Sequence, residues 1–441
     1  MQNLVHATGR TVWYLNDPVE DNPEHNWEDY RVNWESTLVA SLFQPEVWQY
    51  EVAPWPERAF GESYPKKGKP QERESMPPAY ATEVQTVINA LNNLKQSPVE
   101  WDCGTTGIGV LVSDSLMFQR DAPAMSDSHL SHVYGLALPL LKRGMPVTPV
   151  QLENVTIPHY LDGFRVLLLS YHGQKPLTSE VHGPLGDWVK RGGVLVFMDD
   201  DSDPYNSVRE WWNTDGRSYA TPREHLFHAI GISATPTSIL EGQPVNPTEW
   251  HVDKGAVIWL RENPANLATS AAGDARLVEI MQRAATFARL KWHEQNYIML
   301  RRGPYLIAAG LDESVAGEPK ILRGRFVNLF DTELRVRESV TLEPGSRLFL
   351  LDLNATKGKL PCVLASACKT LPTKTNKNAL TLTVEGVGNT SAVVLIAAPK
   401  PPHAVTLEDK VLETFYYSAA DKLLWVRFSN EPRPRELAVR F

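Results

Sequence analysis

Carboxylates and tryptophans gather near the start of the chain, in residues 13–35 (WYLNDPVEDNPEHNWEDYRVNWE). A pair of carboxylates can supply the acid and the nucleophile of glycoside hydrolysis, and aromatic rings stack on the apolar faces of sugars. Tryptophan also fills protein cores, and acidic residues also line solvated loops. The stretch is therefore either the rim of a sugar-hydrolysing site or a tryptophan-rich core with a solvated edge. The elements around it must distinguish these alternatives.

The composition is that of a globular protein and narrows the range of partners. The chain has 441 residues, 42% of them hydrophobic, and a formal net charge of −8. This predicts several domains and argues against a nucleic-acid partner. No apolar run reaches the ~18 residues of a membrane span, and the N-terminus shows no secretory signal. Three scattered cysteines favour a reducing, cytoplasmic location. Without a dinucleotide or phosphate-loop motif, no cofactor is expected.

The N-terminal region alternates predicted strands and helices. Apolar spacing predicts a strand at 10–16, a helix at 30–43, a strand at 47–56 and a helix at 79–94, with a polar, proline-rich loop at 61–78. A strand–helix–strand order predicts parallel strands. The carboxyl ends of the two strands should then lie together, next to the acidic stretch.

The rest of the chain predicts two further architectures. Between residues 101 and 296, continuous apolar strands alternate with helices, which is typical of a doubly wound, flavodoxin-like α/β sheet. From 297 to 441, short strands and turns follow one another without a convincing helix, as in an antiparallel β-sandwich. The predicted fold class is therefore α/β plus all-β.

The middle region resembles the trimerisation domain of family 42 β-galactosidases. The resemblance rests on GIGVLVSD, LALPLLKRGMPVTPV and LDGFRVLLLSYHGQKPLTSEVHGPLGDWVKRGGVLVFMDD, which together cover about 100 residues. In that family this domain follows a (β/α)8 barrel and precedes a small β-domain. The resemblance thus implies that residues 1–100 are the last two βα units of a barrel, 101–296 a trimerisation domain and 297–441 a β-sandwich.

The same resemblance sets the functional expectation. It implies a retaining glycoside hydrolase lineage, a carbohydrate ligand such as a β-galactoside, and a homo-oligomer, expected to be a trimer. A full barrel needs ~250 residues, so barrel strands one to six, and with them the general acid, have no counterpart in this sequence. We expect the isolated chain to be incomplete or inactive. The alternatives are a non-catalytic oligomerisation or carbohydrate-binding protein, or a subunit whose partner chain supplies the missing strands.

Three carboxylates are candidates for the remaining catalytic role. Asp17 and Glu20 follow the first strand, at the end where barrel enzymes build their sites. The family's nucleophile is a glutamate, which favours Glu20, whereas Asp17 is nearer the strand end. Glu51 lies within the second strand and is a rival. For each residue taken singly, an ordinary turn or surface role is the more frequent explanation.

Aromatic residues of the same region are the expected substrate contacts. They are Trp13, His25, Trp27 and Trp55, with a core or capping role as the alternative.

A second acidic run, MDDDSDP at 198–204, alternates Asp199, Asp201 and Asp203 as calcium loops do. Pro204 stands where such a loop requires glycine. We therefore expect a solvated loop and no metal.

Overall fold

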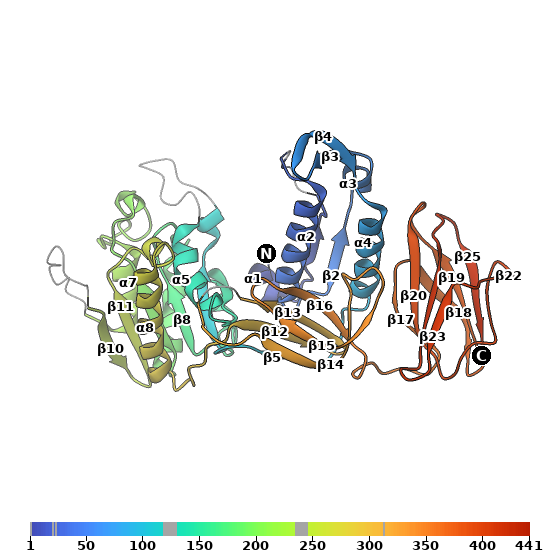
Figure 1. Ribbon diagram of the computed structural model, residues 1–441. Coiled ribbons are helices and arrows are strands. Elements are labelled where there is room, and N and C mark those ends of the chain that lie inside the picture. Colours follow the sequence, from blue (N-terminus) through green and yellow to red (C-terminus); the bar gives the residue numbers. More distant parts are fainter. Residues whose placement is uncertain (1, 20–21, 23, 118–129, 234–245, 312–313) are drawn as a thin grey trace. The chain divides into compact units, whose positions relative to one another are not determined.

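The structure is a computed structural model that describes residues 2–19, 22, 24–117, 130–233, 246–311 and 314–441. The chain divides into two compact units (Figure 1). The α/β unit comprises Met1–Arg10, Cys103–Ile298 and Leu311–Gly317, and the β-rich unit comprises Thr11–Asp102, Met299–Gly310 and Glu318–Phe441. Segments from both predicted flanking domains thus lie in one unit.

The α/β unit is built on a six-stranded sheet with the order β10-β11-β9-β8-β6-β7. Five strands are parallel, and β10 pairs antiparallel at one edge. The strands are β6 (Ile108–Val112), β7 (Thr148–Gln151), β8 (Val166–Leu169), β9 (Val194–Met198), β10 (Thr248–Val252) and β11 (Gly255–Leu260). The central strands are continuous runs of buried apolar residues, as expected of a sheet covered on both faces.

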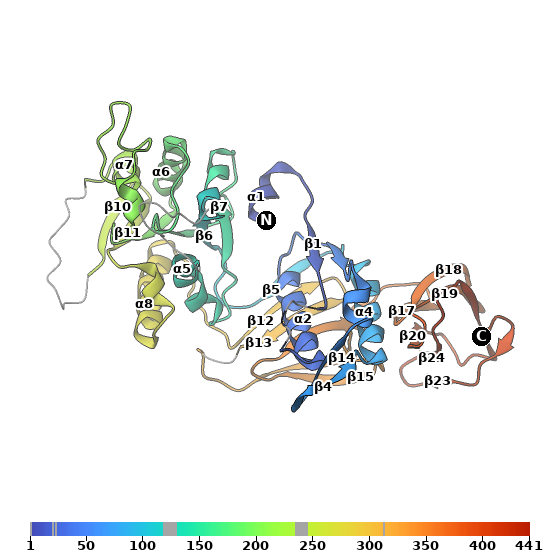
Figure 2. The ribbon, with the colours of Figure 1, turned by 90° about the horizontal axis from the view of Figure 1, so that it is seen from above.

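Helices cover both faces of this sheet, as Figure 2 shows. Val166 and Leu168 of β8 face a core shared with α5 (Ser131–Leu141) and α8 (Ala271–Phe287). Leu167 and Leu169 face the opposite core, shared with α6 (His182–Lys190) and α7 (Pro222–Ile230). The two-residue alternation of a strand produces this division. The loops at the carboxyl ends of the parallel strands remain available for a site. A short helix, α1 (Gln2–Val5), contacts β7.

The β-rich unit begins with two short parallel strands. β1 (Trp13–Asn16) pairs with β2 (Gln49–Val52) in the register Trp13↔Gln49 to Asn16↔Val52, which confirms the predicted adjacent, parallel pair. α2 (Trp27–Leu42) connects them and starts three residues before the predicted helix. The reason is the capping box, in which the Asn26 side chain accepts from the Glu28 and Asp29 N–H groups.

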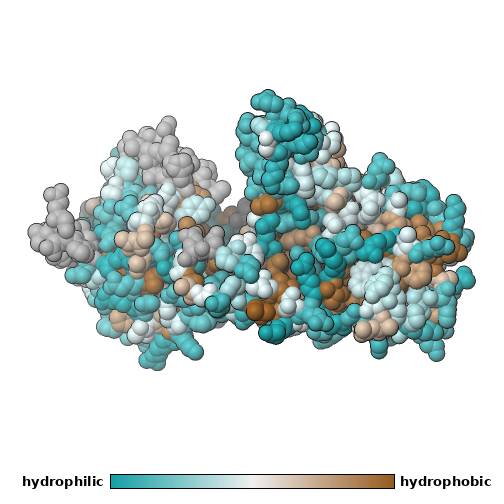
Figure 3. All heavy atoms as spheres, in the orientation of Figure 1, coloured by the Kyte–Doolittle hydropathy of each residue, from teal (hydrophilic) through white to brown (hydrophobic). Residues whose placement is uncertain are grey.

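The prediction of a polar loop at residues 61–78 is wrong. Most of it is a hairpin of β3 (Ser63–Lys66) and β4 (Lys69–Ser75), which follows the short helix α3 (Pro56–Phe60). Gly68 takes the positive φ of 73° that the tight turn needs. The hairpin surface is hydrophilic (Figure 3), so the polar composition that suggested a loop reflects solvent exposure on a strand.

Helices α2 and α4 (Pro78–Leu91) pack on a second six-stranded sheet (Figure 1). Its order is β15-β14-β16-β13-β12-β5. The strands are β5 (Val99–Asp102), β12 (Tyr297–Arg302), β13 (Tyr305–Gly310), β14 (Lys320–Asn328), β15 (Val336–Leu342) and β16 (Arg347–Asp352). One strand from before the α/β unit therefore joins five from after it.

The C-terminal residues form two antiparallel sheets that share one apolar core. The first holds β17 (Cys362–Ser366), β20 (Ser391–Ala397), β24 (Leu423–Ser429) and β23 (Phe415–Ser418). The second holds β18 (Lys369–Asn376), β19 (Ala379–Glu385), β25 (Arg435–Arg440), β21 (Ala404–Leu407) and β22 (Lys410–Val411). The two sheets thus begin at β17 rather than at residue 297.

Candidate functional site

The parallel pairing brings two predicted site residues to the same end of the β1–β2 sheet. Asp17 directly follows β1, and its Oδ2 lies 3.1 Å from the Arg58 Nη1. Trp55 follows β2, and the Arg58 guanidinium lies 6.0 Å from its ring centroid. Asp17 and Trp55 therefore share a neighbour, as adjacent parallel strand ends allow. Asp17 is engaged in this ion pair.

Two other predicted residues lie on an exposed face of the same sheet. Trp13 is 61% exposed and Leu15 54%. Glu51 stands opposite Leu15 in the register and is exposed as well. The candidate Glu20 lies outside the described residues.

The remaining predicted contacts, His25 and Trp27, have different surroundings. His25 Nε2 lies 3.0 Å from the Asn22 Nδ2, and its ring meets Tyr30 edge-on. Trp27 is the first residue of α2 and lines a cavity of about 370 Å³ within the β-rich unit. Of the predicted site residues that the structure describes, Trp27 alone is among those that line this cavity.

Side chains of α2, α4 and the sheet line this cavity, which we call the arginine cleft. On α2 the lining residues follow one helical face at intervals of four, as in Trp27, Arg31 and Glu35. α4 contributes Tyr80 and Glu83. The residues contributed around the sheet are Asn328, Phe330, Asp331, Thr332, Arg335, Arg337 and Arg347.

Two glutamates meet in the wall of the arginine cleft. Arg31 Nε lies 2.9 Å from the Glu35 Oε1 and 2.8 Å from the Glu83 Oε2. Arg347 Nη2 lies 2.8 Å from the other oxygen of Glu35. Both glutamates are buried, Glu83 with 1% of its surface exposed. One arginine thus bridges two carboxyl groups, and a second contacts one of them.

The pair holds one proton at neutral pH. Burial, followed by the negative charge of Glu35, raises the pKa of Glu83 to about 9. The Arg31 guanidinium opposes this shift without cancelling it. Glu83 is therefore protonated at pH 7, since two neighbouring buried carboxyl groups do not both ionise readily.

The cleft has a net positive charge. Arg335 Nε lies 2.8 Å from the Asp331 Oδ2. Burial opposes the ionisation of Asp331, but the bonds from Arg335 outweigh it and lower the pKa. Arg337 makes no ion pair with any described residue, and it is exposed. With Glu83 protonated, four arginines face two ionised carboxylates, so an anionic or hydroxyl-rich ligand fits better than a cation.

The distances in the pair argue against hydrolysis by these two glutamates. A retaining glycosidase holds its carboxyl groups about 5–5.5 Å apart, with the scissile bond between them. Glu35 and Glu83 contact the same nitrogen of Arg31 and share a proton, which leaves no space for a sugar ring between them. Aromatic side chains beside them, Trp27 and Tyr80, supply surface for stacking. The arrangement favours binding over bond cleavage.

The α/β unit contains a second polar cluster, in the acidic run after β9. Asp201 pairs with Arg223 at 2.8 Å, and Asp203 pairs with Lys175 at 2.8 Å. These two aspartates thus take part in ion pairs within the protein rather than facing a common ligand.

Comparisons with known proteins give a loose likeness of fold. No family model and no curated protein matches the chain. Among solved structures, the β-galactosidase of the psychrophilic Marinomonas ef1 matches 73% of this chain and 49% of its own, with 12% identity and a TM-score of 0.40. The β-galactosidase of Rahnella sp. R3 matches 61% and 43%, with 12% identity and a TM-score of 0.35. The GH42 exo-carrageenase of Bacteroides ovatus matches 97% and 42%, with 9% identity and a TM-score of 0.29.

The chain spans less than half the length of each of these enzymes. Among the described residues, no helix has both the length and the apolar character needed to cross a membrane.

Proposed function

We propose that this protein belongs to the retaining glycoside hydrolase lineage that its sequence resembles, and that its described residues bind carbohydrate without hydrolysing it. The observation that carries the binding proposal is the arginine cleft, which combines aromatic faces with several charged hydrogen-bond donors in one cavity. Sugar sites need both features, stacking surface and directed polar contacts. A charged or hydroxyl-rich saccharide is the best-fitting ligand.

Two features of the fold support the proposed lineage. Numbered along the chain, the parallel strands of the α/β unit have the order 2-1-3-4-5, which is the flavodoxin-like order expected of the trimerisation domain. The β1–β2 pair precedes this unit in sequence and matches the expected last two strands of a barrel. The alternative, an unrelated protein with a similar sheet, predicts no saccharide binding.

A titration of the intact protein tests the cleft. Galacto-oligosaccharides, neutral and carboxylated, are added while the intrinsic tryptophan fluorescence and the heat of binding are followed. We expect the Trp27→Ala variant to bind at least 10-fold more weakly, because a stacking face is lost. The matched control is Trp13→Ala, which removes an exposed tryptophan outside the cleft. Binding that disappears in the Trp13 variant and persists in the Trp27 variant would assign the site to the strand ends instead.

The catalytic part of the proposal has its own assay. The pure chain is incubated with a panel of nitrophenyl glycosides, and no turnover is expected. Turnover that survives repurification and disappears in Asp17→Asn or Glu51→Gln would show a working site at the ends of β1 and β2. Turnover that disappears in Glu35→Gln would place it in the arginine cleft.

We further propose a homo-oligomer, with a trimer as the state implied by the resemblance. Trp13 and Leu15 expose apolar surface on one face of β1, and such surface favours association. Within the described residues β1 and β2 form a sheet of two strands, so a partner chain that adds strands remains the alternative. Light scattering distinguishes the outcomes: a 49.4 kDa particle at micromolar concentration contradicts both.

A further inference from the structure

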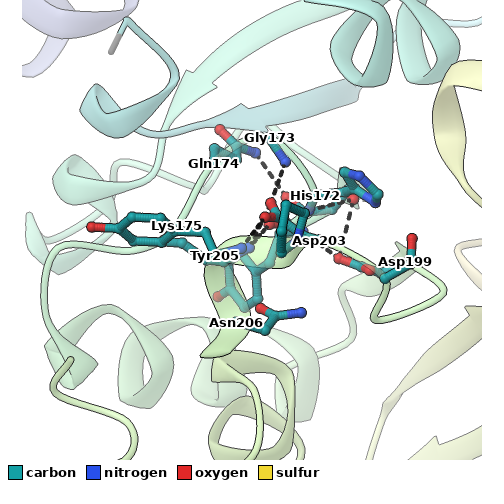
Figure 4. A network of polar contacts seen from close by, with 12 residues as sticks. His172, Gly173, Gln174, Lys175, Asp199, Asp203, Tyr205 and Asn206 are labelled. Atoms are coloured by element: carbon teal, nitrogen blue, oxygen red, sulfur yellow. Dashed lines mark hydrogen bonds and ion pairs between the residues drawn. The ribbon is translucent and has the colours of Figure 1, made fainter. Parts of the chain in front are cut away.

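The carboxyl ends of β8 and β9 bring a histidine and two aspartates together in the α/β unit. His172 lies three residues after β8, and Asp199 and Asp200 directly follow β9. Because these strands are parallel neighbours, their following residues meet at one edge of the sheet. One nitrogen or oxygen atom from each of the three side chains lies within 4.8 Å of those from the other two. Figure 4 labels two of the three, His172 and Asp199.

His172 is buried without a hydrogen-bond partner for its Nδ1. The residue is 6% exposed, and among the described residues Nδ1 makes no hydrogen bond. Its nearest carboxylate oxygen is the Asp200 Oδ1 at 3.6 Å, which is too long for a hydrogen bond. This distance of 3.6 Å between Nδ1 and Oδ1 is close to the distance of roughly 3.4 Å between two ligand atoms of a tetrahedral metal ion whose bonds are about 2.1 Å long.

The imidazole is held in place by its neighbours. The His132 ring stacks on it with a centroid distance of 3.9 Å and an angle of 17°. The backbone N–H of His172 donates a hydrogen bond to the Ser170 Oγ at 3.0 Å. The ring orientation of His172 is therefore fixed by packing.

Hydrogen bonds orient the two carboxylates toward the same place. The Tyr171 N–H donates to the Asp199 Oδ2 at 2.9 Å, and the Asp201 N–H donates to the Asp199 Oδ1 at 2.8 Å. The Ser202 N–H and Oγ both donate to the Asp200 Oδ1. The Asp199 Oδ2 also accepts from the Ser170 Oγ, so the free acceptor positions are on the Asp199 Oδ1 and the Asp200 Oδ2. Such outer contacts are typical of metal-ligating carboxylates.

The charges around the cluster leave two carboxylates uncompensated. Lys175 is paired with Asp203 (Figure 4), and both are almost fully buried. The Lys175 Nζ also donates to the Tyr171 carbonyl. Asp199 is 2% exposed, and no ion pair joins it or Asp200 to a lysine or arginine among the described residues.

We propose that His172, Asp199 and Asp200 bind one divalent transition metal ion, with Zn²⁺ as the best fit. One imidazole nitrogen with two carboxylate oxygens is a donor set that suits Zn²⁺, whereas Mg²⁺ and Ca²⁺ take oxygen ligands. Three protein ligands leave a fourth position open to water. The side chain of Asp200 is 30% exposed, which gives the ion a path from solvent.

Metal binding to the full, tag-free chain tests the proposal. The protein is stripped with EDTA, and Zn²⁺, Mn²⁺, Mg²⁺ and Ca²⁺ chlorides are titrated separately by calorimetry, with metal content measured after gel filtration. We expect one Zn²⁺ per chain, and at least 100-fold weaker binding in His172→Ala and in Asp200→Asn. Co²⁺ in place of Zn²⁺ should give visible absorption bands that both variants lose.

The matched control is His159→Ala. His159 and Asp162 form an exposed histidine–aspartate pair in the same unit, with Nδ1 2.8 Å from Oδ2, so this variant should bind Zn²⁺ as the wild type does. The Asp200 variant replaces a partly exposed side chain, which keeps the test interpretable if His172→Ala fails to fold. A wild-type dissociation constant above 1 mM, or unchanged binding in a folded His172 or Asp200 variant, would overturn the proposal.

Discussion

Each unit of the molecule holds two neighbouring carboxyl groups, at least one of them buried, but the two units compensate their charge differently. In the β-rich unit, Glu35 and Glu83 share a proton and contact Arg31, and Arg347 adds a second positive charge. In the α/β unit, the cluster of His172, Asp199 and Asp200 receives no arginine or lysine ion pair among the described residues. A carboxyl pair that the protein neutralises itself can form the wall of a binding cleft. A pair that it leaves charged provides a position for an added cation.

The largest expected effect on stability comes from removing Lys175, the buried lysine that pairs with Asp203 in the α/β unit. Lys175→Met leaves Asp203 as an unpaired buried charge, which we expect to lower the free energy of unfolding by about 3–5 kcal/mol. Urea melts followed by circular dichroism measure it. The Lys175→Met/Asp203→Asn double variant should recover at least half of the loss, because no charge is then left unpaired. A loss below about 1 kcal/mol in the single variant would contradict the burial of this pair.

Zn²⁺ should stabilise one unit and not the other. At a free concentration of 100 times its dissociation constant, a ligand of the native state adds about 2.7 kcal/mol. Scanning calorimetry of the wild type with and without Zn²⁺ should therefore show an upward shift of the α/β-unit transition. The His172→Ala variant is the control and should show none. A shift shared equally by both transitions would point to non-specific binding.

A smaller effect is expected from the second arginine of the β-rich unit. Arg347→Met removes one of two positive contacts of Glu35, and Arg31 remains. Because Arg347 is partly exposed, we expect a loss of about 1–2 kcal/mol in the free energy of unfolding. Arg433→Met removes the exposed Arg433–Glu408 pair in the same unit and should cost less than Arg347→Met, because water screens an exposed pair. Equal losses in both variants would indicate that the cleft adds nothing beyond a surface ion pair.

The parts of the fold that depend on local pattern could be predicted from the sequence. Continuous apolar runs bounded by glycine identified β6, β8 and β9, and the strand–helix–strand order predicted the parallel pairing of β1 and β2. Long-range pairings could not be predicted in this way. β5 pairs with β12 across about 200 residues of intervening chain, and no local pattern encodes such a partner.

Only some residues of the arginine cleft could be predicted from the sequence. Trp27 was expected to contact ligand and does line the arginine cleft. Glu35 stands in the same acidic stretch, and its spacing of four from Arg31 was the available signal. Glu83 lies on a different helix, so its contact with Arg31 depends on tertiary packing alone. In the proposed metal site, the alternating aspartates of residues 198–204 suggested Asp199 as a ligand. No signal in the sequence indicated His172, because its position beside Asp199 depends on the pairing of β8 with β9.

The smallest effect at pH 5, and the most specific, concerns the proton that Glu83 keeps in the cleft. The folded-state pKa of Glu83 is raised to about 9 by burial and by Glu35. The folded protein therefore keeps a proton that the unfolded chain loses above its ordinary pKa of about 4.5. Stability from this group is complete below that value. The free energy of unfolding should fall as the pH rises from about 4.5 to about 9.

The Glu83→Gln variant isolates this dependence. Its amide is neutral at every pH and mimics the protonated Glu83, so at pH 5, close to the ordinary pKa, we expect a change within about 1 kcal/mol of the wild type. As the pH rises from 5 to 8.5, the variant should gain stability relative to the wild type, because it has no proton to lose. Urea melts at pH 5, 7 and 8.5 measure the difference, with Glu51→Gln as a control at an exposed glutamate of the same unit. Parallel pH profiles for wild type and Glu83→Gln would mean that the glutamates do not share a proton. Glu83 would then carry a negative charge as well, and the net positive charge of the cleft would be smaller.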